Sequence, residues 1–340
     1  MDKLDFSGIE VSAEELVVAL QREGKRRDLK TFPNTAAGHQ AVIRHLSCPG
    51  RTVRVVLEST GLYGLDLALA LQRAQLEVMV ANPRAVRHFA QALMQRSKND
   101  RLDAWVLLEF AARMPFQAWQ PPATPALQLH AVARRLQALT EMQTAEKSRL
   151  AALEATATTP PALRRDLERS LRSQRRALAR LSVEAQKIIQ QEPGLKLRFD
   201  LLISAHGSIA ATSAIQILAE LAVLSPDMDA RQWVAYAGLD PRECSSGSSV
   251  HRKARISKAG NAHLRRALFM PALVAIRHQP HLRAFYQHLC AQGKPKMVAL
   301  TALMRKLLHA IYGMFNHQQP FDGSKVYRRP DPEISTEKAA

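Results

Sequence analysis

The order of strand-like and helix-like segments in residues 1–118 limits most strongly what this chain can fold into. Three short apolar runs come first, separated only by the polar segments SAEE and QREGKRRD, and this pattern predicts an antiparallel meander. The strand-like runs lie at 6–11, 16–20, 29–32, 52–59 and 76–82. The helical segments lie at 36–46, 61–75 and 83–94. Three antiparallel strands followed by alternating helix and strand is the order of a ribonuclease-H-like α/β domain.

Four acidic residues lie where such a domain gathers carboxylates, at strand ends and on a late helix. Glu10 ends the first strand and Glu58 ends the fourth. Asp100 and Asp103 are three residues apart at the start of a predicted helix, so both carboxylates share one face. By itself that pair is also typical of a solvated helix start capped by Asn99 or Asp100. Together the four acids predict a site for one or two Mg²⁺ ions, which prefer oxygen ligands.

Residues 125–192 differ in character from the segments on either side. Two long segments in this range are rich in charged residues and carry apolar residues at helical spacing, and ATTPPA (157–162) separates them. This pattern predicts two antiparallel helices joined by a proline-containing turn, with a coiled coil as one form of that hairpin. The expected packing seam contains Leu136, Leu139, Met142 and Leu150. Several arginines of the second helix fit either a solvated face or a clamp on a nucleic-acid backbone: Arg164, Arg165, Arg169, Arg172, Arg175 and Arg176.

The segment CSSGSSVHRKARISKAGNAHLRRALFM (244–270) is the second candidate for chemistry. It begins as a serine and glycine loop, continues through several cations and enters a helix near Asn261. Such a loop can hold a phosphate, and a serine in it can attack phosphorus. A basic loop that only grips a nucleic-acid backbone fits the same pattern. The candidate nucleic-acid-binding residues are Arg252, Lys253, Arg255, Lys258, Arg265 and Arg266.

The charge balance indicates a polyanionic partner. The 340 residues include 48 Lys and Arg against 30 Asp and Glu, a net charge of +18, which favours nucleic acid first and an anionic membrane second. No apolar run of about 18 residues and no signal peptide is evident, so we expect no membrane partner. The three cysteines are far apart and show no CxxC spacing. This argues against structural zinc and disulfides and favours a reducing cytoplasm.

Several sequence motifs are distributed along most of the chain, and as multi-residue patterns they identify a protein family more specifically than single residues do. They are FPNTAAGHQA, LESTGLYG, ANPRAVRHFAQAL and KNDRLDA in the first half, and AYAGLDPRE, SG, RISKAGNAHLRRALFMPALVAIRH and GKPKMVAL in the second. With them the chain resembles the DEDD transposases of the insertion sequence 110 family, relatives of the Piv DNA invertases. The resemblance implies a RuvC-like domain whose acidic tetrad, Glu10, Glu58, Asp100 and Asp103, binds Mg²⁺. It also implies a nucleophilic serine before a glycine, here Ser246 before Gly247. The family's first acid is normally aspartate, so Glu10 is a departure.

The resemblance further implies an α/β plus α chain with a defined order of parts. They are a RuvC-like (DEDD) domain at 1–118, a helical hairpin or coiled-coil linker at 119–195, a mostly helical transposase domain at 196–322 and a disordered tail at 323–340. Family members are recombinases guided by a structured noncoding bridge RNA, and they act on donor and target DNA as dimers that pair into tetramers. The expected function is therefore RNA-guided, Mg²⁺-dependent recombination through a phosphoserine link. Two alternatives stay open at this point, a hydrolytic nuclease or junction resolvase and an inactive nucleic-acid-binding relative.

Overall fold

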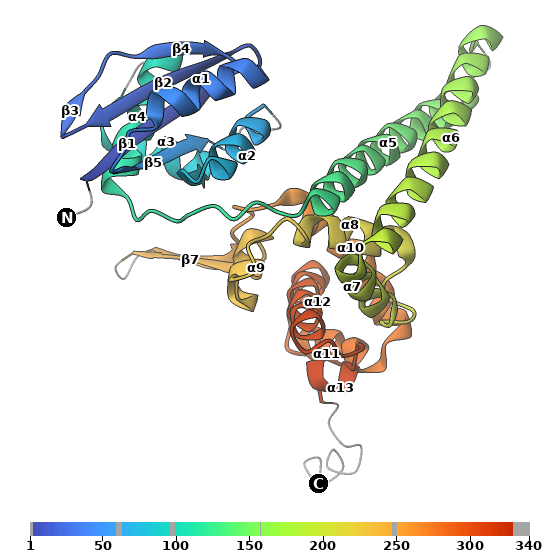
Figure 1. Ribbon diagram of the computed structural model, residues 1–340. Coiled ribbons are helices and arrows are strands. Elements are labelled where there is room, and N and C mark those ends of the chain that lie inside the picture. Colours follow the sequence, from blue (N-terminus) through green and yellow to red (C-terminus); the bar gives the residue numbers. More distant parts are fainter. Residues whose placement is uncertain (1–2, 59–62, 96–98, 157, 247–249, 329–340) are drawn as a thin grey trace, which may run out of the picture. The chain divides into compact units, whose positions relative to one another are not determined.

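The structure is a computed structural model that describes residues 3–58, 63–95, 99–156, 158–246 and 250–328. Within these ranges, residue 3 and residues 243–254 are described by their backbone alone. The chain divides into two compact units, residues 1–121 and residues 122–340 (Figure 1). Each unit has its own buried core, and each is described below by itself.

A mixed sheet of six strands forms the centre of the N-terminal unit. The strands are β1 (Lys3–Val11), β2 (Glu15–Arg22), β3 (Lys25–Arg26), β4 (Lys30–Pro33), β5 (Arg51–Glu58) and β6 (Glu77–Ala81). Their order is β3-β2-β1-β5-β6, and β4 also pairs with β2. The pairs β1–β2 and β2–β4 are antiparallel, whereas β1–β5 and β5–β6 are parallel. This confirms the predicted meander and the ribonuclease-H-like arrangement.

Helices cover both faces of this sheet. They are α1 (Ala36–Leu46), α2 (Leu65–Arg73), α3 (Pro83–Ala92) and α4 (Asp100–Arg113). Val42 of α1 and Leu67 of α2 pack in one buried cluster with Ile9. Val86 of α3 and Phe110 of α4 belong to a cluster on the other face. The helices α1 and α2 therefore lie on one side of the sheet, and α3 and α4 lie on the other (Figure 1).

Gly8 of β1 allows α4 to lie directly on the sheet. A Cβ atom at this position would stand 2.2 Å from the backbone nitrogen of Leu108 and 2.4 Å from the carbonyl oxygen of Ala104. Contacts this short are with backbone atoms, which cannot move aside like the end of a flexible side chain. Any larger residue at position 8 would therefore push α4 away from β1.

Two long helices begin the C-terminal unit and form the predicted hairpin. They are α5 (Thr124–Glu154) and α6 (Pro161–Gln191), which lie side by side (Figure 1). Leu136 and Leu139 of the expected seam are buried. Met142 is 48% exposed, so its assignment to the seam was wrong. The 3.6-residue period turns it out of the contact where the two helices extend beyond the rest of the unit.

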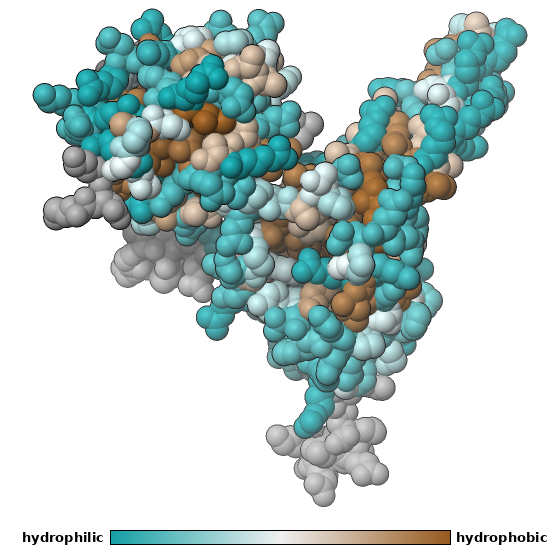
Figure 2. Space-filling model, in the orientation of Figure 1, coloured by the Kyte–Doolittle hydropathy of each residue, from teal (hydrophilic) through white to brown (hydrophobic). Residues whose placement is uncertain are grey.

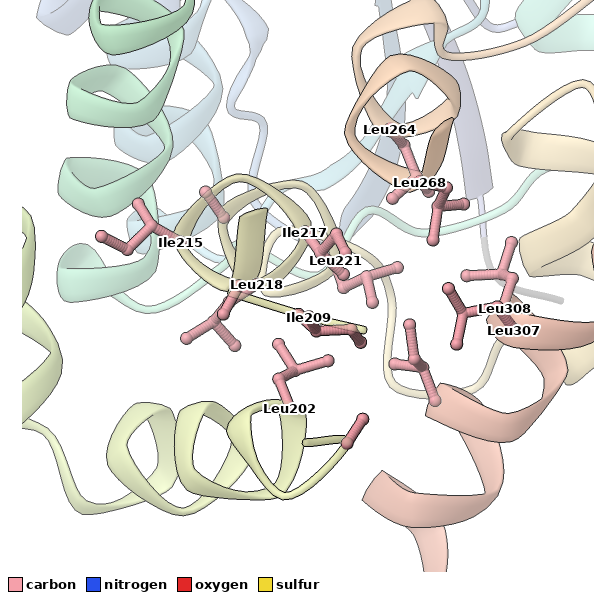
Figure 3. Packing of buried hydrophobic residues seen from close by; sticks show 14 of the residues in the cluster. Leu202, Ile209, Ile215, Ile217, Leu218, Leu221, Leu264, Leu268, Leu307 and Leu308 are labelled. Atoms are coloured by element: carbon pink, nitrogen blue, oxygen red, sulfur yellow. The ribbon is translucent and has the colours of Figure 1, made fainter. Parts of the chain in front are cut away.

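Shorter helices complete this unit. They are α7 (Pro193–Ile203), α8 (Ala211–Leu221), α9 (Ala230–Tyr236), α10 (Ala262–His278), α11 (Pro280–Ala291), α12 (Lys296–His317) and α13 (Gly323–Val326). Figure 3 shows Leu202 of α7 pointing toward Ile209 and α8, within one large buried cluster that also includes Leu264 of α10 and Leu307 of α12. The apolar faces of these helices thus meet in a single core. The tail expected to be disordered from residue 323 begins instead with α13, where the carbonyl oxygen of Val326 accepts from Nζ of Lys306 in α12 at 3.1 Å. Residues 329–340 lie outside the described residues.

Helix α12 departs from the expectation that no segment is long and apolar enough to cross a membrane. By length and composition alone it is a candidate span, although its 18-residue window is 44% buried inside this unit. Leu303, Leu307 and Ile311 are fully buried. Arg305 and Lys306 interrupt its sequence, which is why no continuous apolar run was evident. In this structure α12 packs as a core helix.

The residues on both sides of the expected serine and glycine loop form strands of a β-hairpin, and residues 247–249 lie outside the described residues. Its strands are β7 (Pro241–Ser246) and β8 (Val250–Ile256), paired antiparallel with an irregularity between Arg242 and Cys244. The strands at 244–246 and 250–256 were not predicted, because the pairing of a two-stranded ribbon uses backbone hydrogen bonds and the cations of β8 obscure the strand alternation. The predicted helix after it begins next to Asn261, as expected.

Candidate active site

Glu10 and Glu58 lie side by side at one edge of the sheet. The last residue pair recorded between the parallel strands β1 and β5 is Ile9 with Leu57, and the two glutamates directly follow it. Ile9 and Leu57 belong to the cluster beneath α1 and α2. Since successive side chains of a strand alternate between faces, Glu10 and Glu58 belong to the opposite face, on which α4 lies. Both glutamates are partly buried.

The direction of α4 brings its first turn to the same edge. Ala104, early in the helix, touches Gly8, two residues before the carboxylate of β1. Phe110, late in the helix, belongs to the cluster on which Phe6 packs, nearer the beginning of that strand. The helix therefore runs antiparallel to β1, and its first turn lies where β1 and β5 end.

That first turn contains both predicted aspartates. Asn99 is its N-cap, with a side-chain oxygen that accepts from the backbone nitrogen of Leu102 at 2.9 Å. Neither aspartate is the cap, so capping alone does not account for the pair. Asp100 is exposed and Asp103 is partly buried. Both lie in the positive end of the helix dipole, which favours carboxylates in this turn.

The chemistry of this donor set fits Mg²⁺, a hard ion that takes carboxylate oxygens. Sheet register and helix direction bring all four acids to one edge, as described above. Within the described residues, however, no three His, Cys, Asp or Glu side chains are grouped closely enough to hold a metal ion. Glu10, Glu58 and Asp103 each have other interactions. The side chains would therefore have to converge further to bind an ion.

The second candidate centre is the end of β7. The backbone of Ser246 pairs with Val250 of β8. Its side chain and Gly247 lie outside the described residues, as do the side chains of Arg252 and Lys253. The hairpin therefore places the backbone of the predicted nucleophile at the tip of a two-stranded ribbon.

The described cations near this hairpin fall into two groups. Arg255 and Lys258 are exposed. Arg265 donates to the carbonyl oxygen of Ala237 at 2.8 Å, and Arg266 forms an ion pair with Glu141. The first group is open to a ligand, whereas the second also holds the protein together.

Two protein-family models match this chain. The model of the DEDD-type IS110 transposases matches residues 7–155, and the model described as transposase IS116/IS110/IS902 family matches residues 200–287. The chain belongs to the IS110 family of transposases. Members of this family cut and rejoin DNA. The two matches include the four acids, the hairpin and the start of α10, so the edge of the sheet and the serine lie within the family's two domains.

Curated relatives support the same assignment. The pilin gene-inverting proteins of Moraxella lacunata and Moraxella bovis are each 28% identical to this transposase over 272 residues, which cover 80% of this chain and 82% of theirs. Among solved structures, T. thermophilus RuvC in complex with a Holliday junction substrate matches with a TM-score of 0.27 and 15% identity. That match covers 34% of this chain and 98% of the RuvC chain.

A buried polar network next to the β-hairpin of β7 and β8 was not predicted from the sequence. Glu220 of α8 is 1% exposed and lies 2.7 Å from Nε of Arg134 in α5. Nδ2 of Asn261 donates to the same carboxylate at 2.6 Å and to the hydroxyl oxygen of Tyr236 at 2.8 Å. Asn261 also caps α10, directly after β8 and its connection. The only sequence signal was one acid within the apolar run AIQILAEL.

The charge of Glu220 is held by its neighbours. Burial acts to raise its pKa, but the hydrogen bond with His130, the positive charge of Arg134 and the hydrogen bond from Asn261 outweigh burial and lower the pKa below its usual value. The folded state therefore binds the ionised form more strongly than the unfolded state does. The contribution of this group to stability is fully present above about pH 4.5 and is lost as the pH falls through the lowered folded-state pKa.

We expect Glu220→Gln to destabilise the C-terminal unit by about 3 kcal/mol at pH 7, because it leaves Arg134 without its buried partner. The difference from wild type should shrink as the pH falls below about 4.5. Denaturant unfolding followed across pH measures both effects. The matched control is Glu184→Gln on the exposed side of α6, which should change stability by less than about 0.5 kcal/mol. Equal stability of wild type and Glu220→Gln at pH 7 would contradict a role for this network.

Proposed function

We propose that this transposase is an RNA-guided, Mg²⁺-dependent recombinase that cuts and rejoins donor and target DNA for an insertion sequence. The observation that carries the proposal is the meeting of two strand-end glutamates and the first turn of α4 at one sheet edge, in a domain of the IS110 family. The acids come from three separated segments of the chain, and phosphoryl transfer with bound Mg²⁺ uses such a set of carboxylates.

Glu10, Glu58, Asp100 and Asp103 are the residues that would hold Mg²⁺. When bound, the ion neutralises charge on phosphate oxygens and assists both the attacking and the leaving oxygen. The longer side chain of Glu10, where the family normally has aspartate, still presents a carboxylate from the end of β1.

Ser246 is the proposed nucleophile. Its Oγ would form a bond to phosphorus while the bond from phosphorus to one deoxyribose oxygen breaks, and that oxygen leaves as a hydroxyl after taking up a proton. The proton of the serine hydroxyl passes to a base, because serine is a weak nucleophile at its free pKa. Attack by a DNA hydroxyl on the phosphoserine then restores the serine and joins the new strand. Each step breaks one phosphoester bond and forms another, so rejoining the DNA needs no external energy source.

We infer the binding partners of this transposase from its net charge and from its family. A net charge of +18 suits DNA and a noncoding guide RNA, both of which are polyanions. The cations Arg252, Lys253, Arg255, Lys258, Arg265 and Arg266 would hold phosphates beside the serine. We propose homodimers that pair into tetramers, with active sites completed across subunits. The expected location is the bacterial cytoplasm, in association with the nucleoid.

The test is recombination by the purified protein together with its co-purifying RNA. Labelled donor and target DNA should give joined product in Mg²⁺ and none in EDTA. Denaturing electrophoresis should show a covalent protein–DNA adduct during the reaction. Free DNA ends without an adduct would favour a hydrolytic nuclease or junction resolvase. Binding with neither cleavage nor adduct would favour an inactive nucleic-acid-binding relative.

The cations of β8 give a further prediction. Replacing both Arg252 and Arg255 with glutamine should reduce the magnitude of the slope of log affinity for DNA against log salt by about 1.4 to 1.8, because each phosphate contact contributes about 0.7 to 0.9. Sequence preference should change little, since backbone contacts carry no sequence information. The control with the same loss of charge is Arg113→Gln with Arg149→Gln, two arginines paired with acids on their own helices. A wild-type slope for the β8 variant would place its side chains away from the backbone.

A further inference from the structure

One face of α6 carries a line of cations that the proposed reaction does not use. The residues are Arg165, Arg169, Arg172, Arg176, Arg180 and Lys187. Their spacing is three, four or, once, seven residues, so they lie above one another on a helix of 3.6 residues per turn. All six are exposed. We call this face the basic stripe.

The basic stripe faces away from the packing seam of the hairpin. The buried side chains of α6, among them Leu167, Leu171 and Ile189, lie about half a turn around the helix and pack on the other side. Figure 2 shows the outer surface of the hairpin covered mainly by hydrophilic side chains, with hydrophobic ones between the helices. The stripe is therefore not needed for the contact between α5 and α6.

Acidic residues do not neutralise the basic stripe. The acids of α6 lie to either side of it, at Asp166, Glu168 and Glu184. Glu168 lies 3.9 Å from Arg172, at the limit of an ion pair. Among the described residues, no salt bridge is formed by the other five cations of the stripe. Like charges three or four residues apart destabilise a helix, so a merely solvated face would gain from mixed signs.

The dimensions of the basic stripe suit a rod-like polyanion. It extends over 22 residue steps, about 33 Å at 1.5 Å per residue, with close to one cation per turn. The turn without a cation carries Val183, which is 70% exposed. Helix α6 contains no aromatic residue on which an unpaired base could stack. The features present favour contact with phosphates and provide little for reading bases.

We propose that the basic stripe binds the sugar–phosphate backbone of a double-helical nucleic acid lying along α6, without reading its sequence. A DNA duplex and a duplex stem of RNA share this chemistry, and the probes below distinguish them. This surface is formed by α6 alone, which contains neither the four acids nor Ser246. Its role is to bind nucleic acid and not to cleave it, so the test measures binding alone and its failure would leave the proposed reaction untouched.

The test compares two variants of the full chain that lose the same charge. The stripe variant carries Arg169→Gln, Arg176→Gln and Arg180→Gln. The control variant carries Arg164→Gln and Arg175→Gln, which lie on the flank of α6, and Arg149→Gln on α5. Arg164 and Arg149 already pair with acids. Circular dichroism and thermal unfolding check that both variants keep the hairpin, and the stripe variant should unfold no earlier than wild type because repulsion is relieved.

Binding is measured by fluorescence anisotropy with 20-base-pair DNA and RNA duplexes of the same random sequence, over a range of salt concentrations. For the duplex that the stripe binds, the slope of log affinity against log salt is negative, and its magnitude should decrease by about 2 to 3 in the stripe variant. The control variant should stay within about one unit of wild type. Loss with only one probe identifies that nucleic acid as the ligand. Equal slopes for both variants and wild type, or equal loss in both variants, would overturn the proposal.

Discussion

Asp103→Asn is expected to abolish DNA cleavage and joining in Mg²⁺ while folding and nucleic-acid binding stay intact. Asp103 is the partly buried acid of the pair in the first turn of α4, at the edge where β1 and β5 end. Asparagine keeps the size and the helical position but removes the negative charge. Metal affinity depends on that charge, and a single lost ligand disables a site made of few carboxylates. Product formation should fall by at least about a hundredfold, measured with labelled DNA.

Stability provides an independent measurement of the same change. In metal-free buffer the relief of repulsion among the carboxylates should offset the lost helix-dipole interaction of about 0.5 kcal/mol, so the unfolding temperature should hold or rise. Added Mg²⁺ should raise the unfolding temperature of wild type more than that of the variant. The matched control is Asp66→Asn, an exposed aspartate in the first turn of α2. Cleavage by Asp103→Asn at the wild-type rate would leave the aspartates as a helix-start feature only.

The N-terminal fold was predictable because its signals are local. β2 contains a continuous apolar run, Val53, Val55 and Leu57 alternate with other residues along β5, and α1 occupies the predicted residues 36–46. Asn82 followed by Pro83 begins α3 with a cap and a residue suited to the first turn. Strand ends then determined where acids could meet. The sequence therefore indicated both the sheet and the candidate acids before any contact was known.

Features that depend on distant contacts could not be predicted. The sequence does not reveal that Gly8 lies against the backbone of Ala104, although this contact sets how closely α4 approaches β1. Glu220 acquires its partners from α5 and from the start of α10, which are 86 and 41 residues away along the chain. The sequences of β7 and β8, PRECSS and VHRKARI, do not show the regular apolar and polar alternation that would predict a pair of strands. Each of these depends on pairing or burial that local periodicity does not encode.

The helical hairpin and the transposase domain, predicted as separate parts, belong to one compact unit of the structure. The helical hairpin was expected as a linker between two domains, but its base packs into the core of the C-terminal unit through Leu129 and Ile189. The N-terminal unit ends at residue 121, since Trp119 donates its backbone N–H to Val78 of β6 at 2.7 Å. Glu220 further ties the hairpin to the start of α10. A movement of α5 would therefore be transmitted through Glu220 to Asn261 at the start of α10.

Ser246→Ala is expected to remove the covalent protein–DNA adduct and all recombinant product. Without Oγ no bond to phosphorus can form at this residue, so the loss should be complete within detection. Binding of RNA and DNA should stay normal, because one hydroxyl adds little to an interface dominated by phosphate charge. Denaturing electrophoresis with labelled DNA measures the adduct, and sequencing of products measures joining.

Ser245→Ala is the matched control, one residue earlier in β7, and it should keep both adduct and product. The comparison separates the proposed functions because each predicts a different pair of results. A hydrolytic nuclease would still cut with Ser246→Ala, since water attacks phosphorus in its place. An inactive relative would give no adduct with any variant. An adduct that persists in Ser246→Ala but disappears in Ser245→Ala would move the nucleophile by one residue and keep the chemistry. Recombination by both variants would exclude a serine nucleophile at either position.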